Sequence, residues 1–134
     1  MQRKAILGQN EVTQLLSAAR QAAQDRGLNL TFAVADDGGH LLALERMDNC
    51  APIAASIAAE KARTAALGRR ETKDYEDMIN NGRYAFLSAP TITASLEGGV
   101  PVIIDGHIIG AIGISGARPE IDAEIAKSAL KTLL

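Results

Sequence analysis

The residues best suited to chemistry gather around the first of two Asp-Gly turns in the sequence. Asp36, Asp37 and His40 lie within five positions of one another, and Arg46 and Asp48 follow closely. A neutral imidazole at His40 could ligate a metal or a haem iron, or move a proton. Spacing alone favours a simpler interpretation, in which both aspartates shape the turn and His40 begins a strand in solvent.

A second polar group is expected on a helix. It comprises Glu60, Lys61, Arg63 and Thr64. Glu60 and Thr64 are about one helical turn apart, so they could line a pocket together with a neighbouring sheet. The alternative is an exposed charged face, with Glu60–Arg63 or Glu60–Thr64 contacts that each contribute about 0.2–0.5 kcal/mol. Spacing alone favours the exposed face.

Gly98 and Gly99 stand directly before a strand that contains a proline. Adjacent glycines indicate a positive φ or a close approach of the backbone to a ligand. An equally favoured alternative is a bulge that begins the strand. His107 follows the second Asp-Gly turn and is expected near a loop tip. Cys50 is expected to be a small buried hydrophobe, since most lone cysteines are.

Hydrophobic periodicity predicts the elements that position these residues. Helices are expected over residues 10–26, 52–67 and 73–80 and in a last segment beyond Pro119, and strands over 28–36, 40–47, 102–104 and 107–115. Asn10 is expected to cap the first helix and Thr72 the third. Alternation puts His40 on the same strand face as Leu42 and Leu44, which favours an inward orientation without fixing it.

The predicted order is α-β-β-α-α-β-β-α, with two hairpins separated by helices. Such an order predicts an α+β fold with an antiparallel sheet, because a doubly wound parallel sheet needs alternating strands and helices. Neither a linker nor a repeat interrupts the chain, so residues 1–134 are expected to form one domain.

Composition excludes several classes of function. Fourteen basic against sixteen acidic residues give a net charge of -2, which does not favour nucleic-acid binding. One cysteine cannot form an internal disulfide framework. Phosphate-binding and nucleophile-elbow motifs are missing. Neither a signal-peptide core nor a membrane-length apolar run is found, so a cytoplasmic protein with no membrane partner is expected.

Several blocks of the sequence together resemble the GlcG/HbpS family. They are residues 33–43 with 46–48 and 51–52, 60–69, 96–102 and 110–116. The blocks occur in the family's order and cover nearly the whole chain. Within the family, the sequence most resembles the GlcG branch of bacterial glycolate-utilisation loci.

The resemblance implies a profilin-like, PAS-like α-β sandwich that forms homo-oligomers. It also implies haem or a related tetrapyrrole as the small-molecule ligand, because the relatives HbpS and the C-terminal domain of PduO-type proteins are associated with haem. Carried over by position, His40 is the candidate ligand of the haem iron, with Asp36 beside it. The resemblance further implies pocket walls at Glu60, Arg63, Thr64, Gly98 and Gly99, and propionate partners at Arg46 and Lys61.

Three functions follow from these expectations. The first is a small-ligand-binding domain for haem or a related tetrapyrrole. The second is an enzyme or accessory protein of glycolate and 2-hydroxy-acid metabolism, in which His40 acts as a base or metal ligand and Arg46 or Arg63 holds a carboxylate. The third is an oligomeric assembly protein whose alanine-rich helix is an interface. The sequence contains no nucleophile–base pair, so binding ranks first, and whether turnover occurs is left open.

Overall fold

The structure of the chain, a computed structural model, describes residues 1–134. The elements in chain order are α1 (Gln9–Asp25), β1 (Thr31–Asp36), β2 (Leu41–Arg46), α2 (Ile53–Gly68), α3 (Thr72–Asn80), the 3-10 helix η1 (Tyr84–Ser88), β3 (Gly99–Ile104), β4 (His107–Ser115), α4 (Pro119–Leu130) and the 3-10 helix η2 (Lys131–Leu133). The predicted order of the main helices and strands is confirmed.

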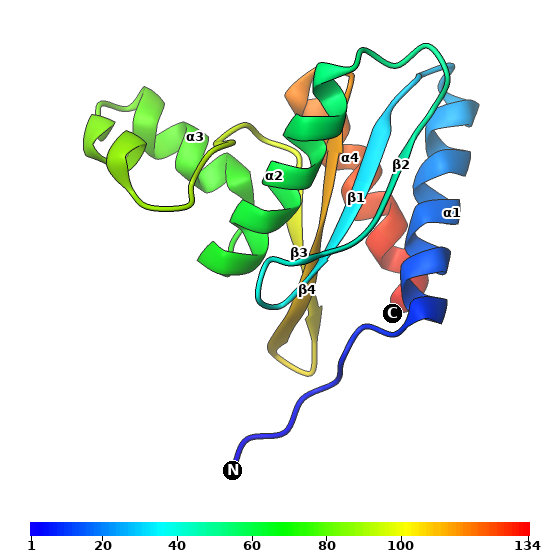
Figure 1. Ribbon diagram of the computed structural model, residues 1–134, viewed down its shortest axis with the longest axis horizontal. Coiled ribbons are helices and arrows are strands. Elements are labelled where there is room, and N and C mark those ends of the chain that lie inside the picture. The colour runs from blue at the N-terminus through cyan, green and yellow to red at the C-terminus, as the bar shows by residue number, and fades with distance from the viewer.

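The four strands form one antiparallel sheet in the order β2-β1-β4-β3. Each Asp-Gly turn closes a hairpin, and the two hairpins join through the β1–β4 pair. Helix α2 covers one face of the sheet, α1 and α4 cover the other, and α3 with η1 projects beyond α2 (Figure 1). The α+β fold with an antiparallel sheet is therefore confirmed.

The two faces of the sheet pack in different ways. On the α1–α4 face, a large aliphatic cluster includes Leu15, Phe32, Ile112 and Ile125. On the α2 face, the strands and the helix meet almost entirely through alanines. Small side chains let the α2 backbone come very close, and a Cβ at Gly113 would lie 2.2 Å from the Ala58 carbonyl oxygen. This close approach fixes α2, and every side chain on it, against the sheet.

A β-bulge displaces the expected alternation in β2. Ala33 pairs with Leu44, but Ala35 pairs with Leu41, so the register shifts by one residue between the two pairs. Leu41 therefore lies on the α2 face with Leu44, whereas strict alternation would have separated them. Leu42 instead lines a cavity beside the start of α1. The predicted grouping of Leu42 with Leu44 was wrong because a bulge cannot be read from alternation.

The ends of several elements differ from those expected. Helix α1 begins at Gln9 after Gly8, not after an Asn10 cap, and the Gly8 amide donates to the Glu11 carboxylate at 2.9 Å. Thr72 is the first residue of α3 rather than its cap. Its hydroxyl donates to the Leu96 carbonyl and accepts from the amide of Gly99. Thr72 therefore joins α3 to the start of β3. No helix combines the length and the apolar content needed to cross a membrane.

Candidate functional site

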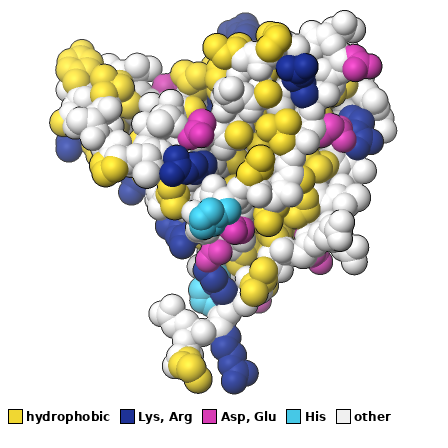
Figure 2. All heavy atoms as spheres, viewed as in Figure 1, with side chains coloured by type: hydrophobic (Ala, Val, Ile, Leu, Met, Phe, Trp, Pro, Cys, Tyr) yellow, Lys and Arg dark blue, Asp and Glu magenta, His cyan; other side chains and the backbone are white.

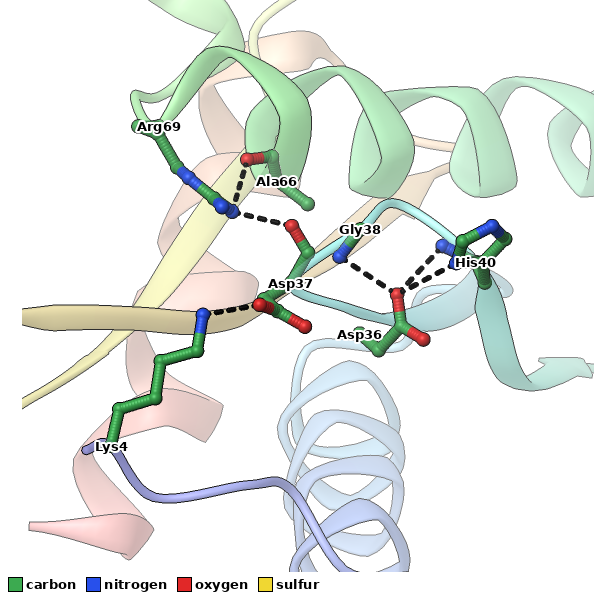
Figure 3. A network of polar contacts seen from close by, with 7 residues as sticks. All are labelled: Lys4, Asp36, Asp37, Gly38, His40, Ala66 and Arg69. Carbon is green, nitrogen blue, oxygen red and sulfur yellow. Dashed lines mark hydrogen bonds and ion pairs between the residues drawn. The ribbon is translucent and has the colours of Figure 1, made fainter. Parts of the chain in front are cut away.

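The β1–β2 turn is organised by one carboxylate oxygen. Asp36 Oδ1 accepts hydrogen bonds from the amides of Gly38 and His40, both at 2.9 Å, and lies 3.3 Å from His40 Nδ1 (Figure 3). The expectation that Asp36 shapes the turn is confirmed. The same carboxylate lies beside one edge of the imidazole ring.

The His40 side chain faces solvent and is 83% exposed. The inward orientation favoured by alternation was wrong, because the residue lies at the free edge strand where nothing packs over it. Nδ1 lies beside the Asp36 carboxylate, so Nε2 is the ring nitrogen left open for a ligand. Metal-binding histidines in proteins are commonly oriented in this way by a carboxylate.

The opposite side of the turn is anchored to α2 and to the N-terminal segment. Arg69 donates to the carbonyls of both Asp37 and Ala66, and Lys4 pairs with the Asp37 carboxylate (Figure 3). The hydrogen bond from Lys4 lowers the pKa of Asp37. These contacts give the loop that carries His40 a fixed position beside the end of α2.

An exposed apolar surface adjoins His40. Leu41 is 54% exposed and Leu44 is 38% exposed, both on the α2 side of the edge strand. Arg63 lies on α2 next to the turn, since its Cγ would be 3.1 Å from a Cβ placed on Gly39. We call His40, Leu41, Leu44 and Arg63 the α2–β2 face. Figure 2 shows hydrophobic side chains spread over the side of the molecule that carries α2 and β2, with a histidine at their border among charged groups.

Glu60 is tied to its surroundings rather than free for a ligand. Its carboxylate accepts from the Thr93 hydroxyl and lies 3.7 Å from the Arg63 guanidinium. The expected Glu60–Arg63 contact on an exposed helix face is therefore confirmed. Because a 3.7 Å separation is loose for such a pair, the Arg63 guanidinium keeps capacity to bind another carboxylate.

Lys61 is buried, and its predicted role as a propionate partner was wrong. The residue is 1% exposed, and its ammonium donates to the Ile114 carbonyl at 2.7 Å and to Asp122 Oδ2 at 3.0 Å. Burial lowers the pKa of Lys61 against the opposing effect of Asp122. Lys61 thus joins α2 to α4 past the end of β4 and cannot reach a ligand on the surface.

Asp122 is the important polar residue that sequence reasoning missed. Burial raises its pKa to about 6, although the Lys61 ammonium and the Ala117 amide both favour the charged form. In the sequence, Asp122 resembles any acidic residue in the first turn of a helix. Its partner is 61 positions away, so no local pattern could have revealed the pair.

Gly98 and Gly99 serve packing rather than a ligand. Gly98 has a φ of +129°, and its missing Cβ leaves room for Lys61, whose Nζ would be 2.7 Å away. A Cβ at Gly99 would lie 2.4 Å from the Lys61 carbonyl oxygen. The predicted positive φ is confirmed at Gly98. The group that approaches this segment closely is the α2 backbone rather than the ligand expected at a pocket wall.

Two further predicted residues lie away from His40. Arg46 lines a polar hollow of about 350 Å³ together with Arg20, Glu45 and Asp48. It lies at the far end of β2, six positions along the chain from His40. Thr64 is buried on α2 and lines a separate small cavity. The structure therefore divides the predicted site into three places.

The remaining candidates form no metal centre. No group of three or more His, Cys, Asp or Glu side chains is positioned to hold a metal ion. His107 is exposed at the second turn. Cys50 is buried, with its sulfur 3.3 Å from the Thr31 hydroxyl. An iron held by His40 would need further ligands that these side chains do not supply.

Comparison with known proteins identifies relatives along nearly the whole chain. A family profile described as "Haem degrading protein HbpS-like" matches residues 7–131. Protein GlcG of Escherichia coli K12 is 63% identical over 115 residues, which cover 86% of this chain and 85% of that protein. Corrinoid adenosyltransferase PduO of Salmonella typhimurium is 27% identical over 92% of this chain, but the match covers only 38% of PduO.

Solved structures show the same fold. A double mutant of Streptomyces reticuli HbpS superposes with a TM-score of 0.91 at 27% identity, covering 100% of this chain and 91% of HbpS. A haem complex of PduOC superposes with a TM-score of 0.85 at 26% identity, covering 95% of this chain and 94% of that one.

Proposed function

The chain belongs to the HbpS-like family, and on that premise we propose that it is a haem-binding domain that uses the α2–β2 face. The single observation that carries the proposal is the solvent-facing imidazole of His40, whose Nδ1 lies 3.3 Å from the Asp36 carboxylate, beside exposed leucines. The haem complex of PduOC, a relative with the same fold, supports the choice of ligand.

His40 and Asp36 supply the ligand to iron in this proposal. A carboxylate on one ring nitrogen fixes the tautomer and raises the basicity of the other nitrogen. The Asp36 carboxylate is itself held by two backbone amides at 2.9 Å, so the imidazole is supported by the turn. Haem bound in this way would provide a redox-active iron, and His40 with the apolar platform would hold it.

Leu41 and Leu44 supply the platform. Both side chains are exposed, and a flat apolar ligand that covers them gains roughly 25 cal/mol for each Å² of apolar surface removed from water. Arg63 lies at the edge of the α2–β2 face, where a guanidinium can bind a propionate with paired hydrogen bonds. The residues present therefore fit one side of a haem.

A homo-oligomer is part of the proposal. The α2–β2 face is open, so a haem lying on it would keep its other side in water. A second copy of the chain that covers this face would complete the site and bury the leucines of both copies. Light scattering with and without haemin would test this, because oligomer formation on this face should strengthen with bound haem.

The experiment that tests the proposed site compares two arginines. Arg63→Gln should weaken haemin binding about tenfold, because it removes a charge-assisted contact to a propionate. Arg26→Gln, at the end of α1 on the opposite face of the sheet, should leave binding unchanged. Spectrophotometric haemin titrations of the two purified variants give both values. Equal effects of the two substitutions would contradict a site on the α2–β2 face.

A second candidate function is an enzyme or accessory protein of 2-hydroxy-acid metabolism. One observation favours it: Arg46 forms no ion pair and lines the polar hollow of about 350 Å³, where it could hold a small carboxylate. Melting temperatures with and without millimolar glycolate, for wild type and Arg46→Gln, test this function. An equal melting temperature in all four samples would remove it.

A further inference from the structure

Strand β2 is a free edge of the sheet (Figure 1). The strand order β2-β1-β4-β3 gives β2 a neighbouring strand on one side only. Just after β2, the Met47 amide donates to the Leu30 carbonyl at 2.9 Å, on the side of β1. Because the backbone groups of successive residues alternate in direction, those of Leu44 and Arg46 face away from β1. The outer side of β2 therefore offers unpaired amides and carbonyls to another strand.

The two edges of the sheet differ in their protection against pairing. Proteins commonly block an exposed edge with a proline, a lysine or a bulge. Strand β3, the other edge, contains Pro101, and proline has no amide hydrogen to donate. Strand β2 contains neither proline nor lysine. Its bulge lies near its start and leaves Ala43 to Arg46 in unbroken register with β1, so β2 is the edge that is open to a further strand.

A strand that pairs with β2 needs apolar side chains on both faces of the sheet. On the α2 side it would contact Leu41 and Leu44, which are both exposed. On the other side it would contact Leu42, which is 44% exposed and lines the cavity beside α1. β2 itself has leucines on both faces, so β2 of a second copy of the chain is the complementary strand.

Symmetry fixes how two copies of β2 can pair. Antiparallel copies are related by a two-fold axis perpendicular to the sheet. Leu44 is the outward-facing residue nearest the middle of Leu41–Arg46, so an axis at Leu44 gives a long overlap and places the two Leu44 side chains opposite each other. The two four-stranded sheets then form one sheet of eight strands. Both α2–β2 faces lie on the same side of this sheet, because the axis is perpendicular to it.

The pairing brings the far end of one β2 next to His40 of the other copy. Arg46 of the second copy comes opposite Leu42, two positions from His40, whereas the chain's own Arg46 is six positions away. Arg46 is exposed and forms no ion pair within the chain. Its guanidinium approaches the end of β2 that carries Asp36, and Asp48 of the second copy comes opposite His40. Opposite charges therefore meet in this register.

We propose that two copies of the chain pair through β2 about a two-fold axis at Leu44, and that Arg46 of each copy completes the haem site at His40 of the other. The role of Arg46 rests on the proposed haem-binding function, whereas the strand pairing does not require haem. Arg46 of the second copy supplies a guanidinium for a propionate in addition to Arg63. A single copy holds His40 and Arg46 in separate places, and the pair joins them.

Cross-linking tests the pairing without haemin. In the full chain, Leu44→Cys should form an intermolecular disulfide on mild oxidation about tenfold faster than Ile103→Cys, because opposed residues of an antiparallel pair lie within disulfide range. Ile103 is the matched control, since it is exposed on the β3 edge. The native Cys50 is buried in both variants. Equal rates of cross-linking would overturn the pairing.

Mixing two variants tests whether Arg46 acts from the second copy. His40→Ala and Arg46→Gln should each weaken haemin binding about tenfold. After subunits exchange, a mixed pair has one site with both residues and one site with neither, so about a quarter of all sites in an equimolar mixture should regain wild-type affinity. A mixture that binds haemin no better than its two components would overturn the role of Arg46. Wild type that binds no haemin would contradict the haem-binding function and the role of Arg46 with it, while the cross-link decides the pairing separately.

Discussion

Replacing Lys61 with Met tests the buried pair that joins the two sides of the sheet. The substitution leaves Asp122, which is 1% exposed, without the ammonium that now lies 3.0 Å away. An unpaired carboxylate in the interior costs about 3–5 kcal/mol. We expect this loss of unfolding free energy at pH 8, where the carboxyl is ionised beside Lys61, so that the variant must either bury an unpaired charge or bind a proton from solvent.

Lys61→Met should cost less unfolding free energy in acid, and the direction of this change follows from the pKa of Asp122. Asp122 has a pKa of about 6 in the folded chain against an ordinary 3.8, a difference of about 3 kcal/mol in favour of the protonated form. Because the pKa of Asp122 is higher in the folded chain, protonated Asp122 stabilises the fold fully below pH 3.8. This contribution is lost as pH rises through about 6. Without Lys61 the folded pKa rises further, so at pH 5 the carboxyl is neutral. The remaining cost is the unpaired Ile114 carbonyl, about 1–3 kcal/mol.

Urea unfolding followed by far-UV circular dichroism at pH 5 and pH 8 measures both values, since the chain has no Trp for fluorescence. Lys127→Met is the matched control: Lys127 is exposed and pairs with Glu71 at 3.1 Å, and its loss should cost less than about 1 kcal/mol at either pH. A cost below about 1 kcal/mol for Lys61→Met at pH 8, or an equal cost at both pH values, would refute the reasoning.

Two other substitutions separate packing from binding. Gly99→Ala should lower the unfolding free energy by about 2–3 kcal/mol, because its Cβ would lie 2.4 Å from the Lys61 carbonyl oxygen. Gly106→Ala is the control, since nothing lies within 4 Å of its Cβ. It should lower the unfolding free energy by only about 1 kcal/mol, because residue 106 has a left-handed backbone conformation. Equal costs in urea unfolding would contradict the packing role of Gly99. Leu44→Asp should weaken haemin binding about tenfold or more while changing stability by no more than about 0.5 kcal/mol. Ile103→Asp on the opposite edge strand, also exposed, should bind haemin as wild type does, and a weakened control would show that the loss is not specific to the α2–β2 face.

The fold could be predicted well because its signals are local. The two Asp-Gly turns set both hairpins, and the spacing of apolar residues distinguishes helices from strands. The first segment to escape this reasoning is β2. Its bulge brings Leu41 opposite Ala35 and Leu44 opposite Ala33, and no periodicity in the sequence indicates an inserted residue.

The site could be predicted only in part, because burial depends on residues far apart in the chain. His40 and Asp36 are four positions apart, and their contact follows from the turn itself. Lys61 was assigned to a ligand because it belongs to a polar stretch of helix. Its burial depends on Asp122 in α4 and on the space left by Gly98, neither of which local spacing can identify.

The most direct test of the haem-binding proposal is a spectrophotometric haemin titration of wild type beside His40→Ala. His40 is exposed, so the substitution should leave the fold intact, which circular dichroism checks. We expect a saturable Soret band at one haem per site in wild type, and a weaker or shifted band in the variant. A flat response from folded wild-type protein, or identical spectra and affinities for the two proteins, would contradict haem ligation at His40.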